Sequence, residues 1–277
     1  MTEELLSGKV IGFIGAGNMA EAVVRGLLRA DAVRPQQLAA ADIDENRLEW
    51  MRETFGISIV KANTELVAAS DIVILAVKPQ VVQRVLEEIG DSMGPSKLLI
   101  SFVAGLSQDA IRARVAGQTR VIRVVPNTPA TVSEAMSCIA SDGPESPRDL
   151  ETARSIFATV GRTLPLPEHH MDAVTALSGS GPAYVFLIAE ALADGGVRMG
   201  LPRPAAAELA AQTLLGAARL LLESGAHPGQ LKDQVTSPGG TTIAGLHRLE
   251  RGGVRAALMD AVQAAAERSV ELGQMAK

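Results

Sequence analysis

The chain has 277 residues, of which 47% are hydrophobic and 21% charged, a composition that is ordinary for a soluble globular protein. At about 150 residues per domain, this length predicts two domains. The formal net charge of −5 argues against a nucleic-acid-binding protein, which would present a basic face. Residues 1–9 lack a signal pattern, and no apolar run reaches the roughly 18 residues of a membrane helix. We therefore expect neither a secreted nor a membrane protein.

The reactive side chains exclude several kinds of site. Cys138 is the only cysteine, so no intrachain disulfide forms, and a single thiol fits a reducing compartment. The four histidines show no metal-ligand spacing with cysteines or carboxylates. The chain also lacks a G-x-S-x-G nucleophile motif and a Walker lysine motif. We expect a cytoplasmic protein that uses no metal.

The first part of the chain alternates short apolar runs with helical patterns. Six runs are predicted to be strands: residues 10–14, 38–41, 57–60, 72–77, 98–100 and 121–125. Helical patterns extend from the first run to about residue 30 and cover residues 44–54 and 64–69. Strands that are apolar on both faces belong to a parallel sheet covered by helices. We predict an α/β fold, with a Rossmann-type doubly wound parallel sheet over residues 1–166.

The second part of the chain shows helical patterns and no convincing strand. Residues 205–223 are rich in Ala and Leu on most sides, and residues 254–272 carry apolar positions at helical spacing. A helix that is apolar nearly all round must be covered by another surface. We predict an all-helical domain over residues 167–277 and a homo-oligomer that forms mainly through it.

The first predicted strand is followed by the motif Gly15-Ala16-Gly17-Asn18-Met19-Ala20, which fits G-x-G-x-x-G/A. Gly15 permits a tight turn, Gly17 lets the backbone approach a pyrophosphate, and Ala20 lets helix and strand pack closely. The helix that starts here offers free N–H groups and a positive dipole end to phosphates. The alternative is a plain glycine-rich turn, but the strand and helix on either side favour a dinucleotide site.

An acid, Asp42, ends the second predicted strand. At this position a carboxylate accepts hydrogen bonds from the adenine ribose and repels a 2′-phosphate, so this residue favours NADH over NADPH. The alternative is that Asp42 caps the helix that follows. Arg47 is near enough in sequence to leave the coenzyme preference open.

Two further loops leave strands at their carboxyl ends, where ligands of open α/β sheets bind. They contain Val77-Lys78-Pro79 and Pro126-Asn127-Thr128-Pro129. Lys78 is predicted to lie at the rim of the crevice or to be a solvated lysine. Asn63 precedes a short helix, and capping explains it as well as ligand binding does.

Small-residue clusters at residues 177–184 and 235–246 precede helical segments of the second domain. Ser, Gly and Thr before an apolar helix leave N–H groups and hydroxyls that point at one spot, which suits a small carboxylate. Ordinary helix capping is the alternative. Together the patterns indicate a nicotinamide oxidoreductase that acts on a small anion.

These motifs resemble the Δ1-pyrroline-5-carboxylate reductase family along nearly the whole chain. The segments that carry the resemblance are residues 12–20, 76–79, 127–129, 177–184, 191–197, 227–233 and 235–250. The Ser-Gly-Ser-Gly-Pro and Ser-Pro-Gly-Gly-Thr-Thr segments together are highly specific. The resemblance implies reduction of the C=N bond of L-1-pyrroline-5-carboxylate to L-proline with NADPH or NADH, the last step of proline biosynthesis.

The resemblance also implies roles for particular residues. Thr242, whose hydroxyl would bind the ring nitrogen, and Lys78 are the catalytic candidates. The substrate-binding candidates are Asn127, Ser180, Ser237, Gly240, Thr241 and Thr242. The coenzyme-binding candidates are Gly15, Ala16, Gly17, Asn18, Met19, Asp42, Asn63, Ala76, Val77, Lys78, Pro79, Ser101, Val103 and Ala104. The family assembles as dimers through its helical domain, often five dimers in a decamer.

Two other functions compete with this reading. A β-hydroxyacid dehydrogenase has a similar layout but relies on a lysine of its helical domain, and Lys232 is the only lysine between Lys97 and Lys277. A non-catalytic NAD(P)-binding protein would be expected to lose the two clusters, and both are intact.

Overall fold

The computed structural model describes residues 5–275, and the statements that follow concern those residues. The chain forms two compact units. The first contains the residues up to Ser180 and those from Ala264 onward, and the second contains Gly181–Gln263.

The first unit is built on an eight-stranded sheet in the order β3-β2-β1-β4-β5-β6-β7-β8. The strands are β1 (Ile11–Ile14), β2 (Leu38–Ala41), β3 (Ser58–Ile59), β4 (Ile72–Leu75), β5 (Leu98–Ser101), β6 (Arg120–Val125), β7 (Ala135–Ala140) and β8 (Gly161–Leu166). The first six strands are parallel and lie in the 3-2-1-4-5-6 order of a dinucleotide-binding sheet. The six predicted strands and the doubly wound fold are therefore confirmed.

Two further strands, β7 and β8, were not predicted from the sequence and extend this mainly parallel sheet. β7 pairs antiparallel with β6, and β8 pairs parallel with β7. Only a short segment separates β6 from β7, too short for the crossover that a parallel pair needs, so the chain must return antiparallel. β8 was missed because it is an edge strand that contains Pro165 and alternates between partly buried and exposed residues.

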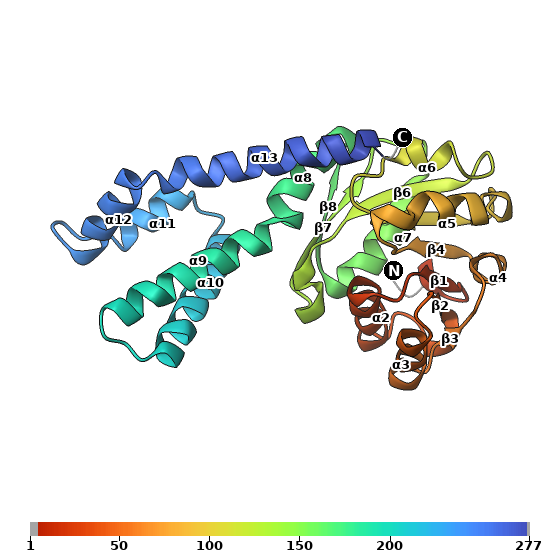
Figure 1. Ribbon diagram of the computed structural model, residues 1–277, viewed down its shortest axis with the longest axis horizontal. Helices are drawn as coiled ribbons and strands as arrows, with labels where there is room; N and C mark the ends of the chain where they lie inside the picture. Colours follow the sequence, from red (N-terminus) through yellow and green to blue (C-terminus); the bar gives the residue numbers. More distant parts are fainter. Residues whose placement is uncertain (1–4, 276–277) are drawn as a thin grey trace. The chain divides into compact units, whose positions relative to one another are not determined.

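Helices cover both faces of this sheet (Figure 1). They are α2 (Asn18–Arg29), α3 (Glu45–Phe55), α4 (Asn63–Ala69), α5 (Val82–Ile89), α6 (Gln108–Arg112), α7 (Pro147–Phe157) and α8 (Met171–Val174). Ile72 and Ile74 of β4 pack in the cluster with α2, α3 and α7, whereas Val73 and Leu75 pack in the cluster with α4, α5 and α6. This alternation gives two cores, because successive side chains of a strand point to opposite faces.

Short helical turns connect these elements. Six are 3₁₀ turns: Pro35–Gln37, Pro79–Val81, Gly90–Ser92, Thr128–Val132, Ala158–Val160 and Glu168–His170. Thr175–Gly179 is one π-helical turn. Such turns are rare and occur frequently at functional sites.

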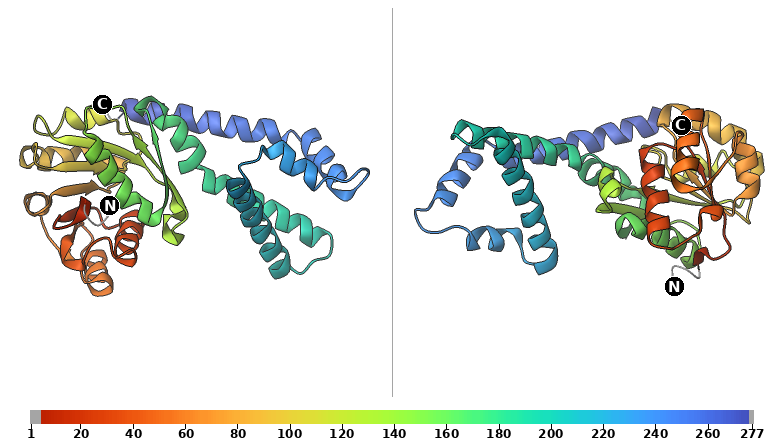
Figure 2. Two further views of the ribbon diagram at one scale, coloured as in Figure 1. Left: turned by 180° about the vertical axis from the view of Figure 1, so that it is seen from behind. Right: turned by 90° about the horizontal axis from the view of Figure 1, so that it is seen from below.

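The second unit contains α9 (Gly181–Arg198), α10 (Arg203–Ser224), α11 (Pro228–Gln234), α12 (Thr241–Arg251) and the first part of α13 (Val254–Met275). α9 and α10 lie side by side and share a small core of Ala193, Ala206 and Ala210 (Figure 2). Its described residues contain no strand, as predicted. Many large apolar side chains remain exposed, among them Phe186 at 67% and Leu187 at 66%.

Two helical stretches, Glu168–Arg198 and Arg203–Ser224, are long and apolar enough to cross a membrane, judged by length and composition. We expected no stretch long and apolar enough for a membrane helix, and by length and composition this expectation is not met. Core helices of soluble proteins pass the same test, so this property is weak evidence for a membrane span.

The compact units divide at a different place from the predicted domain boundary after residue 166. The first unit continues through α8 to Ser180 and regains the chain at Ala264. Met171 and Val174 of α8 pack in a cluster with Cys138 and Ala140 of β7, which explains why this helix belongs to the sheet unit. The packing of α8 on β7 joins residues that are distant in the sequence, so the division after Ser180 could not be predicted from local patterns.

Candidate functional site

In the turn between β1 and α2, the backbone at Gly15 lies close to the backbone at Ala76, after β4. Gly15 has a φ of +100°, and its N–H donates to the carbonyl oxygen of Ala41 at 2.8 Å. A Cβ at Gly15 would lie 2.6 Å from the carbonyl oxygen of Ala76, the residue that follows β4. Only glycine satisfies both conditions, so the motif brings the loops after β1, β2 and β4 together.

The N-terminus of α2 is open above Gly17. A Cβ on Gly17 would meet no heavy atom of the described chain within 4 Å. The first helical hydrogen bond runs from Glu21 N to Gly17 O at 2.9 Å, so the N–H groups of Asn18, Met19 and Ala20 have no partner within the helix. Ala20 is buried against the sheet, with 1% of its surface exposed. The glycines and helix end thus fit a pyrophosphate.

Asp42 binds the glycine-rich loop. Its Oδ2 accepts the N–H of Ala16 at 2.6 Å, and its Oδ1 accepts the N–H of Asp44 at 3.0 Å. The cap of α3 is Asp44, whose side chain accepts the N–H groups of Asn46 and Arg47. The alternative that Asp42 caps this helix is therefore wrong, and Asp42 instead joins the loops after β1 and β2.

Arg47 holds the other side of the same peptide. Its Nε donates to the carbonyl oxygen of Ala16 at 2.6 Å, and its Nη2 lies 2.5 Å from Oε2 of Glu21. Its guanidinium also stacks 4.3 Å from the ring centre of Trp50. Burial raises the pKa of the Glu21 carboxyl, but the hydrogen bonds from Arg47 and Arg25 outweigh burial and leave the pKa below its usual value.

A cavity of about 500 Å³ adjoins this loop. It is lined by Asp42, Ile43, Glu45, Leu48, Glu49, Ile59, Val60 and Lys61. The apolar side chains suit a flat ring, and the carboxylates can accept hydrogen bonds from hydroxyl groups.

The coenzyme candidates after β4 and β5 lie beside the turn at Gly15. The N–H of Ala76 donates to Ile14 O at 2.8 Å, and the N–H of Phe102 donates to Leu75 O at 3.3 Å. Lys78 is exposed at the start of the Pro79–Val81 turn. Ser101 is fully buried, and its hydroxyl accepts the N–H of Val103 at 3.3 Å, so its side chain shapes the loop from within.

Asn63 is the first residue of α4 rather than its cap. The cap position is occupied by Ala62, and the amide of Asn63 donates to Oε2 of Glu88 at 2.9 Å. The capping explanation for Asn63 is therefore wrong. Its amide lies at the carboxyl side of the sheet and takes part in a hydrogen bond at the surface.

Asn127 joins the loop after β6 to the first small-residue cluster. Its Nδ2 donates to the carbonyl oxygen of Ser178 at 3.1 Å, and its Oδ1 accepts the N–H of Met136 at 3.0 Å. The π-helical turn that follows closes with a hydrogen bond from Ser180 N to Thr175 O at 2.8 Å. The structure thus assigns Asn127 a role in fixing the turn that leads to Ser180.

The second cluster makes an uncapped helix start in the second unit. Gly240 N donates to Ser237 O at 3.1 Å, which closes a tight turn before α12. The first helical bond runs from Ala244 N to Gly240 O at 3.4 Å, and no side chain caps the helix. The N–H groups of Thr241, Thr242 and Ile243 therefore have no partner within the helix and can hold a carboxylate.

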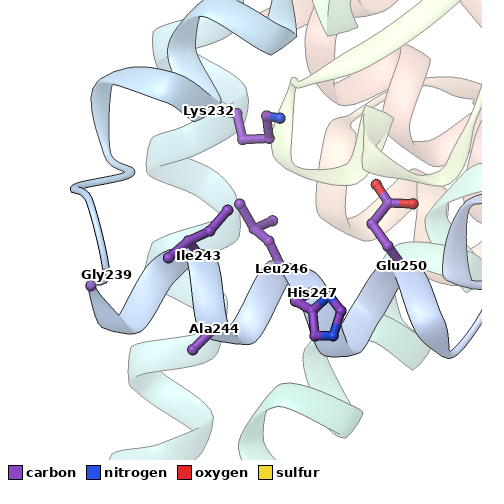
Figure 3. Close-up of a pocket in the computed structure, with 8 residues that line it drawn as sticks. Lys232, Gly239, Ile243, Ala244, Leu246, His247 and Glu250 are labelled. Atoms are coloured by element: carbon purple, nitrogen blue, oxygen red, sulfur yellow. The ribbon is translucent and has the colours of Figure 1, made fainter.

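A cavity of about 550 Å³ borders this helix start. It is lined by Lys232, Gly239, Gly240, Ile243, Ala244, Leu246, His247 and Glu250. Lys232 extends from α11 toward the side of α12 on which Glu250 carries its carboxylate (Figure 3). Neither His247 nor Glu250 was among the site residues predicted from the sequence. Their helical spacing with Ile243 could have indicated them, because residues 243, 247 and 250 lie on one face of a helix.

The predicted site residues thus form groups within each unit. The coenzyme candidates gather at the carboxyl ends of β1, β2, β4 and β5, with Asn127 and Ser180 in the same unit. Ser237, Gly240, Thr241 and Thr242 lie together in the second unit. Within the part of the chain that the structure describes, no three His, Cys, Asp or Glu side chains are grouped to hold a metal ion.

Two family models match the sequence. The model described as pyrroline-5-carboxylate reductase dimerisation matches residues 168–272. The model described as NADP oxidoreductase, coenzyme F420-dependent, matches residues 10–105. The first match covers the helical region with both small-residue clusters, and the second covers the strands and loops of the dinucleotide site.

Relatives are similar over nearly the whole chain. A pyrroline-5-carboxylate reductase of Methanosarcina acetivorans is 49% identical over 97% of this chain and 100% of its own length. One of Arabidopsis thaliana is 48% identical over 95% of each chain.

Solved structures of the same kind are similar too. The pyrroline carboxylate reductase of Plasmodium falciparum with NADP bound has a TM-score of 0.87 and 33% identity, and the match covers 96% of this chain and 98% of that one. The pyrroline-5-carboxylate reductase of Coxiella burnetii has a TM-score of 0.89 and 35% identity over 95% and 98% of the two chains.

Proposed function

The chain belongs to the pyrroline-5-carboxylate reductase family, and from this premise we propose how its residues reduce pyrroline-5-carboxylate to L-proline. The reaction is the last step of proline biosynthesis. When bound, the reduced nicotinamide coenzyme supplies the hydride that the carbon of the C=N bond accepts. The protein holds the two reactants in position and binds the charges of the substrate.

The loops of the first unit would hold the coenzyme. The N–H groups at the start of α2 would bind the pyrophosphate, and the cavity beside Asp42 would take the adenosine. Two loops at the carboxyl ends of the strands would contact the nicotinamide half. They contain Ala76, Val77, Lys78 and Pro79 after β4, and Val103 and Ala104 after β5. Asn63 lies on the same carboxyl side.

Carboxylates at the adenosine cavity favour NADH over NADPH. Asp42, Glu45 and Glu49 line that cavity, and only Lys61 opposes them there. Arg47, the guanidinium that could compensate for a 2′-phosphate, is paired with Glu21 and with Ala16 O. A dianionic phosphate would meet like charges and a cation that already has partners.

The substrate would bind at the start of α12. The N–H groups of Thr241 and Thr242 bind the substrate carboxylate in the positive end of the helix. The Thr242 hydroxyl hydrogen-bonds the ring nitrogen and orients it. A threonine hydroxyl is a poor acid, so the imine enters as its protonated iminium, which is the better electrophile. Ser237 and Gly240 complete this group in the second unit. Ser180 stays a substrate-binding candidate of the first unit, where Asn127 fixes its turn through Ser178.

The exposed apolar side chains of the helical region support self-association. Phe186, Leu187 and Leu222 are each more than 60% exposed, and the dimerisation model covers all three. Water-exposed apolar area on this scale marks an interface. A homodimer in the cytoplasm, built through residues 168–272, accounts for this surface without a membrane.

A coenzyme oxidation assay tests the function directly. Purified protein is mixed with L-pyrroline-5-carboxylate and either NADH or NADPH, and absorbance is followed at 340 nm. Oxidation that depends on the substrate is the expected result, with the larger kcat/KM for NADH. Folded protein that binds a coenzyme but oxidises none in the presence of the substrate would refute the proposal.

A further inference from the structure

The C-terminal end of α13 packs directly against the loop that follows β5. A Cβ on Gly273 would lie 2.9 Å from the carbonyl oxygen of Gly105, and a Cβ on Gly105 would lie 3.4 Å from Gly273 N. Gly105 also has a φ of +73°, a conformation that side chains disfavour. The two segments are far apart in sequence, yet their backbones touch, and no side chain fits between them without a shift.

A polar network fixes this end of α13 to the first unit. The hydroxyl of Ser269, only 4% exposed, donates to Oδ1 of Asp172 at 2.7 Å. Oδ1 of Asp172 lies 3.9 Å from Nη2 of Arg123, whose Nη1 donates to Oε1 of Glu168 at 3.1 Å. Arg123 lies on β6 and is almost fully buried. The helix end is therefore attached to the sheet rather than free to move away from the loop.

The other sides of the same loop are also held. The ring of Phe102 meets that of Phe157 edge to face, with 6.2 Å between centres. At the far end, the N–H of Gln108 donates to Oε1 of Glu168 at 3.1 Å. The segment of residues 103–106 is thus held at Phe102 on one side and at Gln108 on the other, and α13 contacts it at Gly105. A shift at Gly273 would act on Ala104 and Gly105, because Val103 and Leu106 are buried in the core and the N–H of Val103 is held by the Ser101 hydroxyl.

We propose that the C-terminal end of α13 positions the loop after β5 for coenzyme binding, with Gly273 and Gly105 as the positioning residues. This inference rests on the proposed function, which gives Val103 and Ala104 to the nicotinamide half of the site. Neither glycine needs to touch the coenzyme. Their close contact sets how far Ala104 stands from it, and small displacements of positioned groups have large effects on binding and rate.

The test compares Gly273→Ala with Gly117→Ala. Gly117 is an exposed glycine of the same unit, and a Cβ there would meet nothing within 4 Å in the described chain. We expect Gly273→Ala to raise the Kd for NADH at least fivefold by isothermal titration calorimetry and to raise its KM in parallel. kcat at saturating coenzyme and the KM for pyrroline-5-carboxylate stay within about twofold. Gly117→Ala leaves all four values unchanged.

Thermal unfolding separates positioning from folding. Alanine stabilises a helix relative to glycine, so an unimportant contact predicts an unchanged or higher Tm and an unchanged Kd for Gly273→Ala. An unchanged Kd with an unchanged or higher Tm would overturn the proposal. A lower kcat with an unchanged Kd would also overturn it, because this result indicates only a smaller folded fraction. Ser269→Ala, which removes the anchor but leaves the glycine contact, raises the Kd less than Gly273→Ala does. A chain that shows these Kd changes but oxidises no coenzyme would refute the proposed function alone.

Discussion

Arg47 and Glu21 form an ion pair across the start of the dinucleotide loop, with 2.5 Å between Nη2 and Oε2. The same guanidinium donates to the carbonyl oxygen of Ala16, and Asp42 accepts the N–H of that residue. One residue of the loop is therefore held from both sides. Asp42 also lines the cavity that we propose for the adenosine, so we expect this side chain to act on both loop geometry and coenzyme choice.

The coenzyme preference should change when the charge of Asp42 is removed. Asp42→Asn keeps the shape and an acceptor for the N–H of Ala16, but it gives up the acceptor for the N–H of Asp44 and no longer repels a 2′-phosphate. We expect the ratio of kcat/KM for NADPH to that for NADH to rise about tenfold, which corresponds to roughly 1.4 kcal/mol. Steady-state assays with both coenzymes measure the ratio.

A matched control for this change is Glu53→Gln, which removes an exposed carboxylate of α3 that does not line the cavity. Its ratio should equal that of the wild type. An unchanged ratio in Asp42→Asn would remove Asp42 from coenzyme discrimination.

Stability should depend on pH through Glu21. Its pKa in the folded protein is held below the ordinary value of 4.5, so its contribution is present above that pH and is lost as the pH falls through the folded pKa. Glu21→Gln should be less stable at pH 7, by on the order of 1 kcal/mol. The difference from the wild type should shrink toward pH 3.

Urea unfolding of both proteins at several pH values measures this effect. A gap between the two free energies of unfolding that stays constant from pH 7 to pH 3 would contradict a role of the ionised carboxylate.

The hydroxyl of Thr242 should act on the substrate and not on the coenzyme. Thr242→Ala should lower kcat/KM for pyrroline-5-carboxylate about tenfold or more, since one hydrogen bond to a charged partner is worth roughly 1.5–3 kcal/mol. The Kd for NADH, measured by calorimetry, should stay within twofold. Thr242→Ser restores a hydroxyl and should recover most of the activity. Equal activity of the Ala and Ser variants would remove this hydroxyl from the site.

Asn127 should contribute to both stability and activity. Asn127→Ala removes the hydrogen bonds to Ser178 and Met136 and leaves their partners unsatisfied, so we expect about 2 kcal/mol less stability. The freed turn at Ser178 should also raise the KM for the substrate. Asn63→Ala, which loses one exposed hydrogen bond to Glu88, should cost less than about 0.5 kcal/mol. Similar losses in the two variants, by urea unfolding, would argue against the bridging role of Asn127.

The sequence alone predicted the elements whose cause is local. The apolar runs of β1, β2, β4, β5 and β6 and the motif from Gly15 to Ala20 were sufficient, because strand burial and a glycine turn leave their signals in adjacent residues. The small-residue clusters at residues 177–184 and 235–246, which precede α9 and α12, were also predicted because their signal lies in adjacent residues. The family resemblance added the substrate.

The tertiary structure decided what depends on partners that are distant in the chain. β7 pairs with the edge of β6 and β8 pairs with β7, and Asp42 holds Ala16 because two loops end beside each other. The pairing of Arg47 with Glu21 and the contact of Gly105 with Gly273 are further cases. Such contacts join residues with no common local pattern, so only the folded chain brings them within reach of each other.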